Sequence, residues 1–146
     1  MCPTPTLLPS PTDFSFTFPP QPQWVRSARH AVRTALAPVA PAGSDLVELA
    51  ALLTSELVTN AMTASLASLT PTPVSLHGEW SPTGTIRILV HDQAPGTPAS
   101  PAGFPPPDAE NGRGLPLIDL HATTWGICHH TPGRGKITWC TLDTKG

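Results

Sequence analysis

The chain has 146 residues, of which 39% are hydrophobic and 12% charged, and its net charge is −2. This length allows one domain with a buried core and is too short for two. The chain has no basic tract, so we expect no direct nucleic-acid partner. No apolar stretch reads as long enough to cross a bilayer, so no membrane partner is expected either.

The N-terminal region is rich in proline, with seven prolines in the first 22 residues. This composition predicts an extended, disordered tail over residues 1–12, ahead of a domain over 13–143. The tail lacks the charged region and the apolar region of a signal peptide. Three cysteines, an odd number without framework spacing, are typical of reduced thiols. We therefore expect a cytoplasmic domain.

The predicted elements follow from periodicity and from the positions of the prolines. The alternating Phe14, Phe16 and Phe18 predict a half-buried strand over 13–18. Apolar residues at helical spacing predict one helix over 23–37, and a second from Asp45, capped by Ser44, to about Leu69. Further strands are predicted over 74–80, 85–92, 123–130 and 136–142, with a short helix from Leu115 to His121. Early helices and late hairpins favour an α+β two-layer sandwich.

The stretch TSELVTNAMTAS, residues 54–65, places two polar side chains within the predicted long helix. Glu56 and Asn60 are four residues apart, so they lie one turn apart on the same side. Asn60 falls inside the apolar arc of the helix, and Glu56 lies at its edge. One interpretation is structural, with the amide bonded to backbone and the carboxylate paired with an arginine. The other is a magnesium and water site, since an amide oxygen is a hard ligand and a carboxylate can deprotonate a nucleophile.

Two further segments end an ordered element in a glycine-containing turn. In ILVHDQAPG, residues 88–96, an apolar strand runs into Asp92. An aspartate there commonly initiates a turn, but it can also accept from an exocyclic amine such as that of adenine. In ENGRGLPLID, residues 110–119, Gly112 and Gly114 flank Arg113 directly before a helix. Such a segment can bind an anion through backbone amides and the helix start, and a flexible hinge would have a similar composition.

The order of these segments resembles that of the histidine kinase-like (GHKL, Bergerat-type) ATPase superfamily. SELVTNA (55–61) is similar to its N-box, VHDQAPG (90–96) to its first glycine box, and GRGLPLI (112–118) to its second. The chain is most similar to small stand-alone bacterial ATP-binding proteins of the anti-sigma-factor serine/threonine kinase type, from about Phe14 to Leu142. The resemblance implies a mixed, mostly antiparallel sheet with helices on one face, and a lid loop over 96–114.

The resemblance also implies roles for the matched residues, with ATP and Mg²⁺ as cofactors. Asn60 would bind Mg²⁺, and Glu56 would be the base toward a serine hydroxyl or water. Asp92 would bind the adenine amino group. The remaining matched residues would shape the pocket floor (Gly96) and contact the triphosphate (Gly112, Arg113 and Gly114).

Three places depart from the family pattern. Ala94 stands where the superfamily has a glycine, and Met62 and Thr63 follow the N-box where basic or histidine residues are usual. In the final strand Ile137 takes the place of a threonine that helps to bind near adenine. We expect that Thr138 cannot substitute for it, because one step along a strand reverses the face.

The resemblance implies one function, and two alternatives remain open. The expected function is an ATP- and Mg²⁺-binding regulator that phosphorylates a serine or threonine of a small antagonist protein and sequesters a sigma factor. One alternative is a catalytically silent, nucleotide-gated protein-binding module. The other is a detached catalytic domain of a sensor histidine kinase, although no dimerisation helix or phosphoacceptor segment precedes the domain. A homodimer is also among the expected assemblies.

Overall fold

The computed structural model describes residues 14–38, 45–68, 71–80, 84–93, 114–128 and 135–143. The predicted tail, residues 1–12, and all of the predicted lid except Gly114 lie outside these ranges. The described elements follow one another as β1 (Phe14–Phe18), α1 (Trp24–Leu36), α2 (Asp45–Ala67), β2 (Val74–Trp80), β3 (Thr85–Asp92), α3 (Gly114–His121), β4 (Thr124–Cys128) and β5 (Lys136–Asp143). Each predicted helix and strand is present, so the element prediction from periodicity is confirmed.

The strands form one open sheet in the order β1-β2-β3-β5-β4. Every pairing between the described strands is antiparallel, in keeping with the mixed, mostly antiparallel sheet that the resemblance implied. In the β2–β3 pair Val74 lies opposite Asp92, and in the β3–β5 pair Asp92 lies opposite Lys136. The α+β class is confirmed, and the carboxyl end of β3 meets the start of both of its neighbours.

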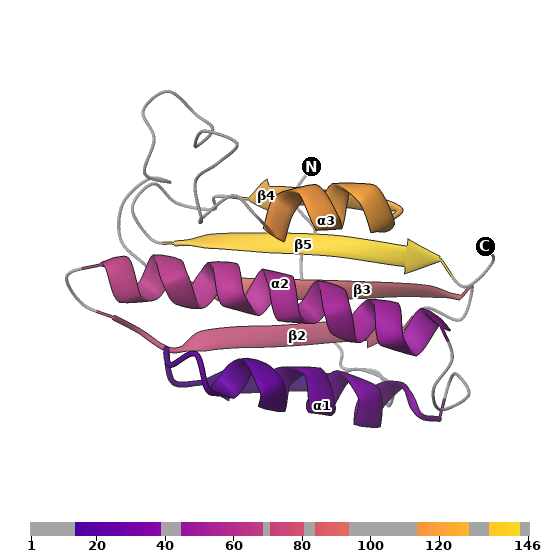
Figure 1. Ribbon diagram of the computed structural model, residues 1–146, viewed down its shortest axis with the longest axis horizontal. Helices are drawn as coiled ribbons and strands as arrows, with labels where there is room; N and C mark the ends of the chain where they lie inside the picture. Colours follow the sequence, from indigo (N-terminus) through magenta and orange to yellow (C-terminus); the bar gives the residue numbers. More distant parts are fainter. Residues whose placement is uncertain are drawn as a thin grey trace.

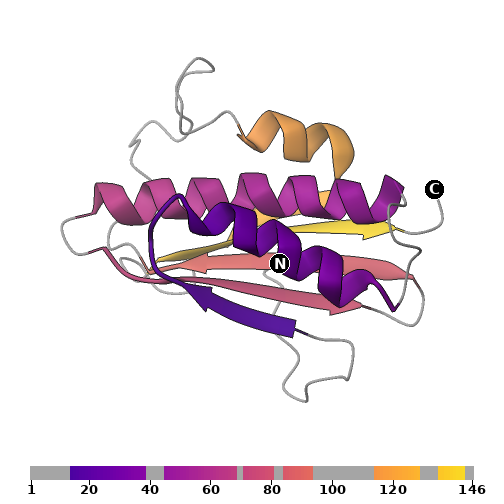
Figure 2. The same ribbon diagram turned by 60° about the horizontal axis from the view of Figure 1, so that its bottom comes forward.

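All three helices pack on one face of this sheet (Figures 1 and 2). In Figure 1, α2 crosses the middle of the sheet, with α1 on the side of β1 and β2 and α3 on the side of β4 and β5. The main core lies between the helices and the sheet, where Leu53 and Leu57 of α2 and Ile88 and Val90 of β3 are fully buried. The two-layer arrangement expected from the sequence is therefore present, and it leaves the other sheet face without a helix among the described residues.

Helix α2 is apolar on most of its circumference. By length and composition alone its 23 residues could cross a membrane, so the expectation that no apolar stretch is long enough was wrong. Half of this apolar stretch of α2 is buried inside the domain. The helix buries residues such as Leu57 and Val58 and contacts both other helices and the central strands. Its apolar character is explained by its position at the centre of the core.

Helix α1 packs one side against α2 and presents the other to solvent. Ala28, Val32 and Leu36 are buried, as the spacing predicted. On the exposed side, Arg33 Nε donates to Glu48 Oε2 of α2 at 2.8 Å. This hydrogen bond lowers the pKa of Glu48 below its ordinary value. The pair identifies the edge of α2 that faces α1.

The two cysteines of the described ranges lie on opposite faces of the sheet. Cys140 is a free thiol, fully buried in the main core opposite Ile88. Cys128 belongs to a second, smaller cluster with Leu89 and Ile137, and it is disulfide-bonded. The expectation of reduced thiols is therefore confirmed at Cys140 and wrong at Cys128.

Candidate functional site

Four chain segments meet at the end of the sheet where β3 stops. Asp92, the last residue of β3, lies between Val74 at the start of β2 and Lys136 at the start of β5. The C-terminal end of α2 is fixed to this same end by Ser65, whose hydroxyl donates to the carbonyl of Thr72 at 2.6 Å and accepts from its amide at 2.9 Å. The C-terminal half of α2 therefore lies beside the end of β3 (left in Figure 1).

Helix α3 begins toward this end of the sheet and runs away from it. After α3, the amide of Thr123 donates to the carbonyl of Thr141 at 2.8 Å, and β4 then runs back along β5 to place Cys128 opposite Ile137. Since Thr141 lies near the far end of β5, α3 ends at the far end, and its N-terminal end lies nearer the Asp92 end (Figures 1 and 2). The described part of the second glycine box, from Gly114 onward, thus begins on the side of the sheet end that holds Asp92.

Glu56 and Asn60 lie on the edge of α2 that faces away from α1. At roughly 100° per residue, Glu56 lies about 80° and Asn60 about 120° around the helix axis from Glu48. The buried Met62 lies about 40° from Glu48 in the opposite direction. Glu48 pairs with α1, and the figures show α1 and α3 on opposite sides of α2. Both side chains are half-buried, so Asn60 lies at the edge of the core and not inside it as predicted. Their edge is the one next to α3.

No hydrogen bond or ion pair joins Glu56 or Asn60 to another side chain within the described ranges. The structural interpretation, an arginine partner for the carboxylate, is therefore not met in this part of the chain. No group of three or more His, Cys, Asp or Glu side chains that could hold a metal occurs among the described residues. A metal at this edge would need ligands from a bound molecule in addition to the Asn60 amide oxygen. That coordination fits Mg²⁺, which commonly uses one or two protein oxygens plus substrate phosphates.

Asp92 is a buried carboxylate with a half-buried cationic partner. Its side chain is 1% exposed, and Lys136 Nζ donates to its Oδ2 at 2.7 Å from a side chain that is 13% exposed. Asp92 lies two residues after Val90 of the main core, so it points to the helix-covered face. The sequence prediction placed Asp92 in a pocket, and the structure places it at the covered end of the sheet.

The partner of Asp92 is brought into place by a glycine. Gly135 has a φ of +90°, a conformation that other residues rarely adopt. A Cβ built on it would lie 2.0 Å from the Asp92 carbonyl oxygen and 2.7 Å from the Gln93 Cα. Only glycine allows the start of β5 to come this close to the end of β3, and Lys136 follows directly.

Lys136 was not among the predicted site residues, and the faces predicted for its neighbours were wrong. Ile137 lies on the sheet face without helices, in the cluster with Leu89, so it does not occupy a position beside Asp92. Thr138 is buried and lies opposite Val90, on the same face as Asp92 and Lys136. The expectation that Thr138 faces away is therefore wrong. A buried aspartate at a strand end needs a partner, and the lysine that follows the TPGRG turn was the available signal.

The other predicted site residues are divided between described and undescribed parts of the chain. Gly114 is the first residue of α3. Gly96, Gly112 and Arg113 lie outside the described residues, as does the departing residue Ala94. Met62 is buried in the core and Thr63 is exposed, so packing explains the first of these two departures.

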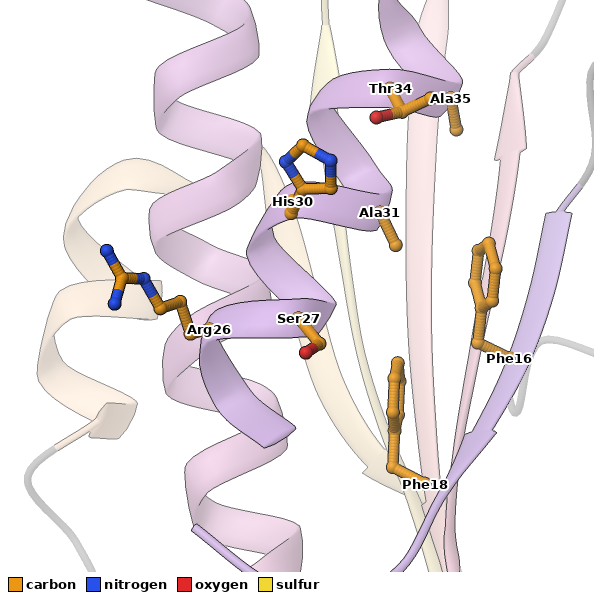
Figure 3. A pocket seen from close by; sticks show the side chains of 8 residues that line it. All are labelled: Phe16, Phe18, Arg26, Ser27, His30, Ala31, Thr34 and Ala35. Carbon is orange, nitrogen blue, oxygen red and sulfur yellow. The ribbon is translucent and has the colours of Figure 1, made fainter. Parts of the chain in front are cut away.

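A cavity of about 700 Å³ lies elsewhere, between β1 and α1 (Figure 3). Phe16 and Phe18 form one wall, and Ser27, Ala31 and Ala35 of α1 form the facing one, with Arg26 and His30 beside them. None of the predicted site residues lines it. The cavity is therefore separate from the region that contains Asp92.

Comparison with known families gives one match, which covers most of the chain. The family model described as "Histidine kinase-like ATPase domain" matches residues 18–140. This range includes Glu56, Asn60, Asp92 and Lys136. A comparison with curated proteins finds none that matches the chain.

Proposed function

Because the chain belongs to the histidine kinase-like ATPase family, we propose that it is a regulatory protein kinase that uses ATP and Mg²⁺. ATP binding follows from the family. The proposed substrate is a serine or threonine of a small antagonist protein, and the proposed second partner is a sigma factor that the kinase sequesters in the cytoplasm. The observation that carries the proposal is the common position of Glu56 and Asn60 on one half-buried edge of α2, toward the end of the sheet that holds Asp92.

Each of these side chains has a chemical role in the proposed reaction. Glu56 would accept the proton of the substrate hydroxyl while the hydroxyl oxygen bonds to the γ-phosphorus and the bond to the bridging oxygen of ADP breaks. Asn60, one turn further, would be the protein ligand of Mg²⁺, and a bound metal ion would neutralise charge on the phosphates. Asp92 would accept a hydrogen bond from the adenine amine. The family resemblance supports these assignments, and the half-buried position of Glu56 and Asn60 is compatible with them.

The test separates nucleotide binding from phosphotransfer. Asp92→Asn keeps an acceptor for Lys136 but weakens recognition of the base, so it should lose most of the ATP-dependent rise in melting temperature. For the wild type, ligand at 100-fold above Kd corresponds to about 2.7 kcal/mol of stabilisation. Glu56→Gln should keep that rise and lose transfer of labelled phosphate to a candidate antagonist.

The outcomes distinguish the candidate functions. Wild-type protein that gains no stability from ATP and Mg²⁺ would contradict the nucleotide site. Wild-type protein that binds ATP and yet transfers no label to an antagonist that it binds would favour the nucleotide-gated module. Ser55→Ala, next to Glu56 on the half-buried opposite edge of α2, is the matched control and should change neither measurement.

We also propose that the chain forms a homodimer through β1. This strand is outermost in the described sheet, and its Phe16 is 40% exposed beside the cavity along α1. An open edge offers backbone donors and acceptors to a second strand. Light scattering at micromolar concentration should give a molecular mass of twice that of one chain for the wild type, and a mass of one chain for Phe16→Glu. A monomeric wild type would contradict the proposal.

A further inference from the structure

Cys128 forms a disulfide, and the sequence leaves one cysteine of this chain as its partner. Cys128 is the last residue of β4 and is disulfide-bonded. The chain has three cysteines, and Cys140 is a free thiol buried on the opposite, helix-covered face of the sheet. A bond within the chain therefore joins Cys128 to Cys2. Cys2 belongs to the proline-rich segment that precedes β1 in the sequence.

The segment between Cys2 and β1 is long enough to reach Cys128. Phe14, the first residue of β1, lies in the same row of paired residues as Trp125 of β4, at the other edge of the sheet. Four strand spacings across the sheet and three residues along β4 separate Phe14 from Cys128, which amounts to roughly 22 Å. The chain from Cys2 to Phe14, when extended, spans as much as about 40 Å. The strand order therefore permits this disulfide.

Cys128 lies on the outer face of the sheet, which we define as the face opposite the helices, with Leu89 of β3 and Ile137 of β5 (Figures 1 and 2). These three side chains are only 6%, 3% and 7% exposed. No described helix or strand lies over them. A single sheet layer leaves the tips of its side chains in water, so their burial requires a covering segment.

The N-terminal segment has the chemistry to cover this cluster. Residues 2–12 read CPTPTLLPSPT, an uncharged stretch with four prolines and the adjacent Leu7 and Leu8. Trp139, which is half-buried, packs against the cluster on the outer face. Proline-rich chains are extended and dock onto aromatic side chains, and an uncharged segment covers an apolar surface without desolvating a charge.

We propose that a disulfide between Cys2 and Cys128 holds residues 2–13 across the outer face, and that reduction of this bond releases the segment and uncovers the apolar cluster. In the cytoplasm, where this chain is proposed to act, disulfides are rare and are mostly transient or redox-sensing. The proposal does not depend on the nucleotide site, because the outer face is the one opposite the helix that carries Glu56 and Asn60.

A dithiol reductant opens the bond by two exchange steps. One thiolate of the reductant attacks the sulfur of Cys2, because Cys128 is almost fully buried, and the sulfur of Cys128 leaves as a thiolate and takes up a proton. The second thiolate of the reductant then displaces Cys2, which also takes up a proton. The two cysteines gain two electrons and two protons, and the reductant leaves as a disulfide.

Peptide mapping of the full-length chain tests the pairing. The three cysteines fall in separate tryptic peptides, residues 1–26, 114–134 and 137–145. After equilibration with oxidised glutathione, the first two peptides should appear as one linked species, which a dithiol separates. A linked pair of two 114–134 peptides, or free thiols at both Cys2 and Cys128, would overturn the pairing.

Chymotrypsin tests the release, because the bond between Leu7 and Leu8 is a target within the segment. Mass spectrometry should show cleavage there at least tenfold slower in oxidised than in reduced wild-type protein. Cys128→Ser removes the disulfide and should be cut at the rate of the reduced wild type in both conditions. Cys140→Ala, the matched control, keeps the disulfide and should behave as the wild type. Equal rates for oxidised and reduced wild type would overturn the release.

Leu89→Ala tests where the segment lies. This variant keeps the disulfide and removes most of one apolar contact on the outer face, so cleavage of its oxidised form should be several-fold faster than that of the oxidised wild type. An unchanged rate would overturn the position assigned to the segment. Circular dichroism establishes folding, and if Leu89→Ala is unfolded, Ile137→Val is measured in its place with the same direction of change expected.

Discussion

Replacement of Gly135 by alanine tests the contact that brings β5 against the end of β3. Two costs combine in Gly135→Ala. A residue with a side chain at a φ of +90° is strained by about 1–2 kcal/mol. The new Cβ would also lie 2.0 Å from the Asp92 carbonyl oxygen, a backbone atom that moves only with its strand. Relief of such overpacking typically costs about 1–3 kcal/mol. The expected loss is about 2–5 kcal/mol, or roughly 6–15 °C in melting temperature for a domain of this size.

Urea denaturation of the wild type and of Gly135→Ala measures this loss. An unchanged m-value, the slope of the unfolding free energy against urea concentration, shows that the native state is intact. Gly126→Ala is the matched control, since the three atoms nearest to its Cβ would belong to the Trp139 side chain, at 3.0 to 3.1 Å, and a side chain can shift where a backbone atom cannot. The control should lose less than about 1 kcal/mol. Equal stability of the two variants would refute the argument, because it would mean that the strand end tolerates a Cβ at Gly135. Gly135→Ala should also weaken ATP, since the end of β3 that carries Asp92 would have to shift.

Two further predictions concern buried polar groups. Ser65→Ala should lower the free energy of unfolding by about 2–4 kcal/mol, because the amide and the carbonyl of Thr72 both lose their hydrogen-bond partner. The control Ser68→Ala removes only a bond to the carbonyl of Ser65 and should cost less than about 1 kcal/mol. Equal losses of the two variants in urea denaturation would contradict this prediction. Burial raises the pKa of the Cys140 thiol to about 12. The pKa of this thiol is higher in the folded state than in the unfolded state. Burial of the neutral thiol therefore makes its full contribution to folding stability below about pH 8.5, and that contribution is lost as the pH rises toward 12. Ellman's reagent should modify Cys140 only in unfolding conditions, and rapid modification of the native protein at pH 8 would contradict its burial.

The sequence by itself determined the elements of this fold and one part of its site. Alternation at Phe14, Phe16 and Phe18 predicted β1, and helical spacing predicted α1 and α2, because these periods are properties of the local backbone. The four-residue spacing of Glu56 and Asn60 placed both on one side of α2 for the same reason. The order of the three motif segments then indicated the family, which the family match confirms.

The tertiary structure decided which residues meet across the sheet. Lys136 is 44 positions from Asp92, and nothing local to either residue specifies that they pair. The face of Ile137 and Thr138 depended on the register of β5 against β3, and a shift of one residue reverses every side chain. That register is set by the buried face of the whole sheet and by the close approach at Gly135, both of which are long-range contacts. Periodicity is encoded along the chain, whereas register is encoded in packing between distant segments.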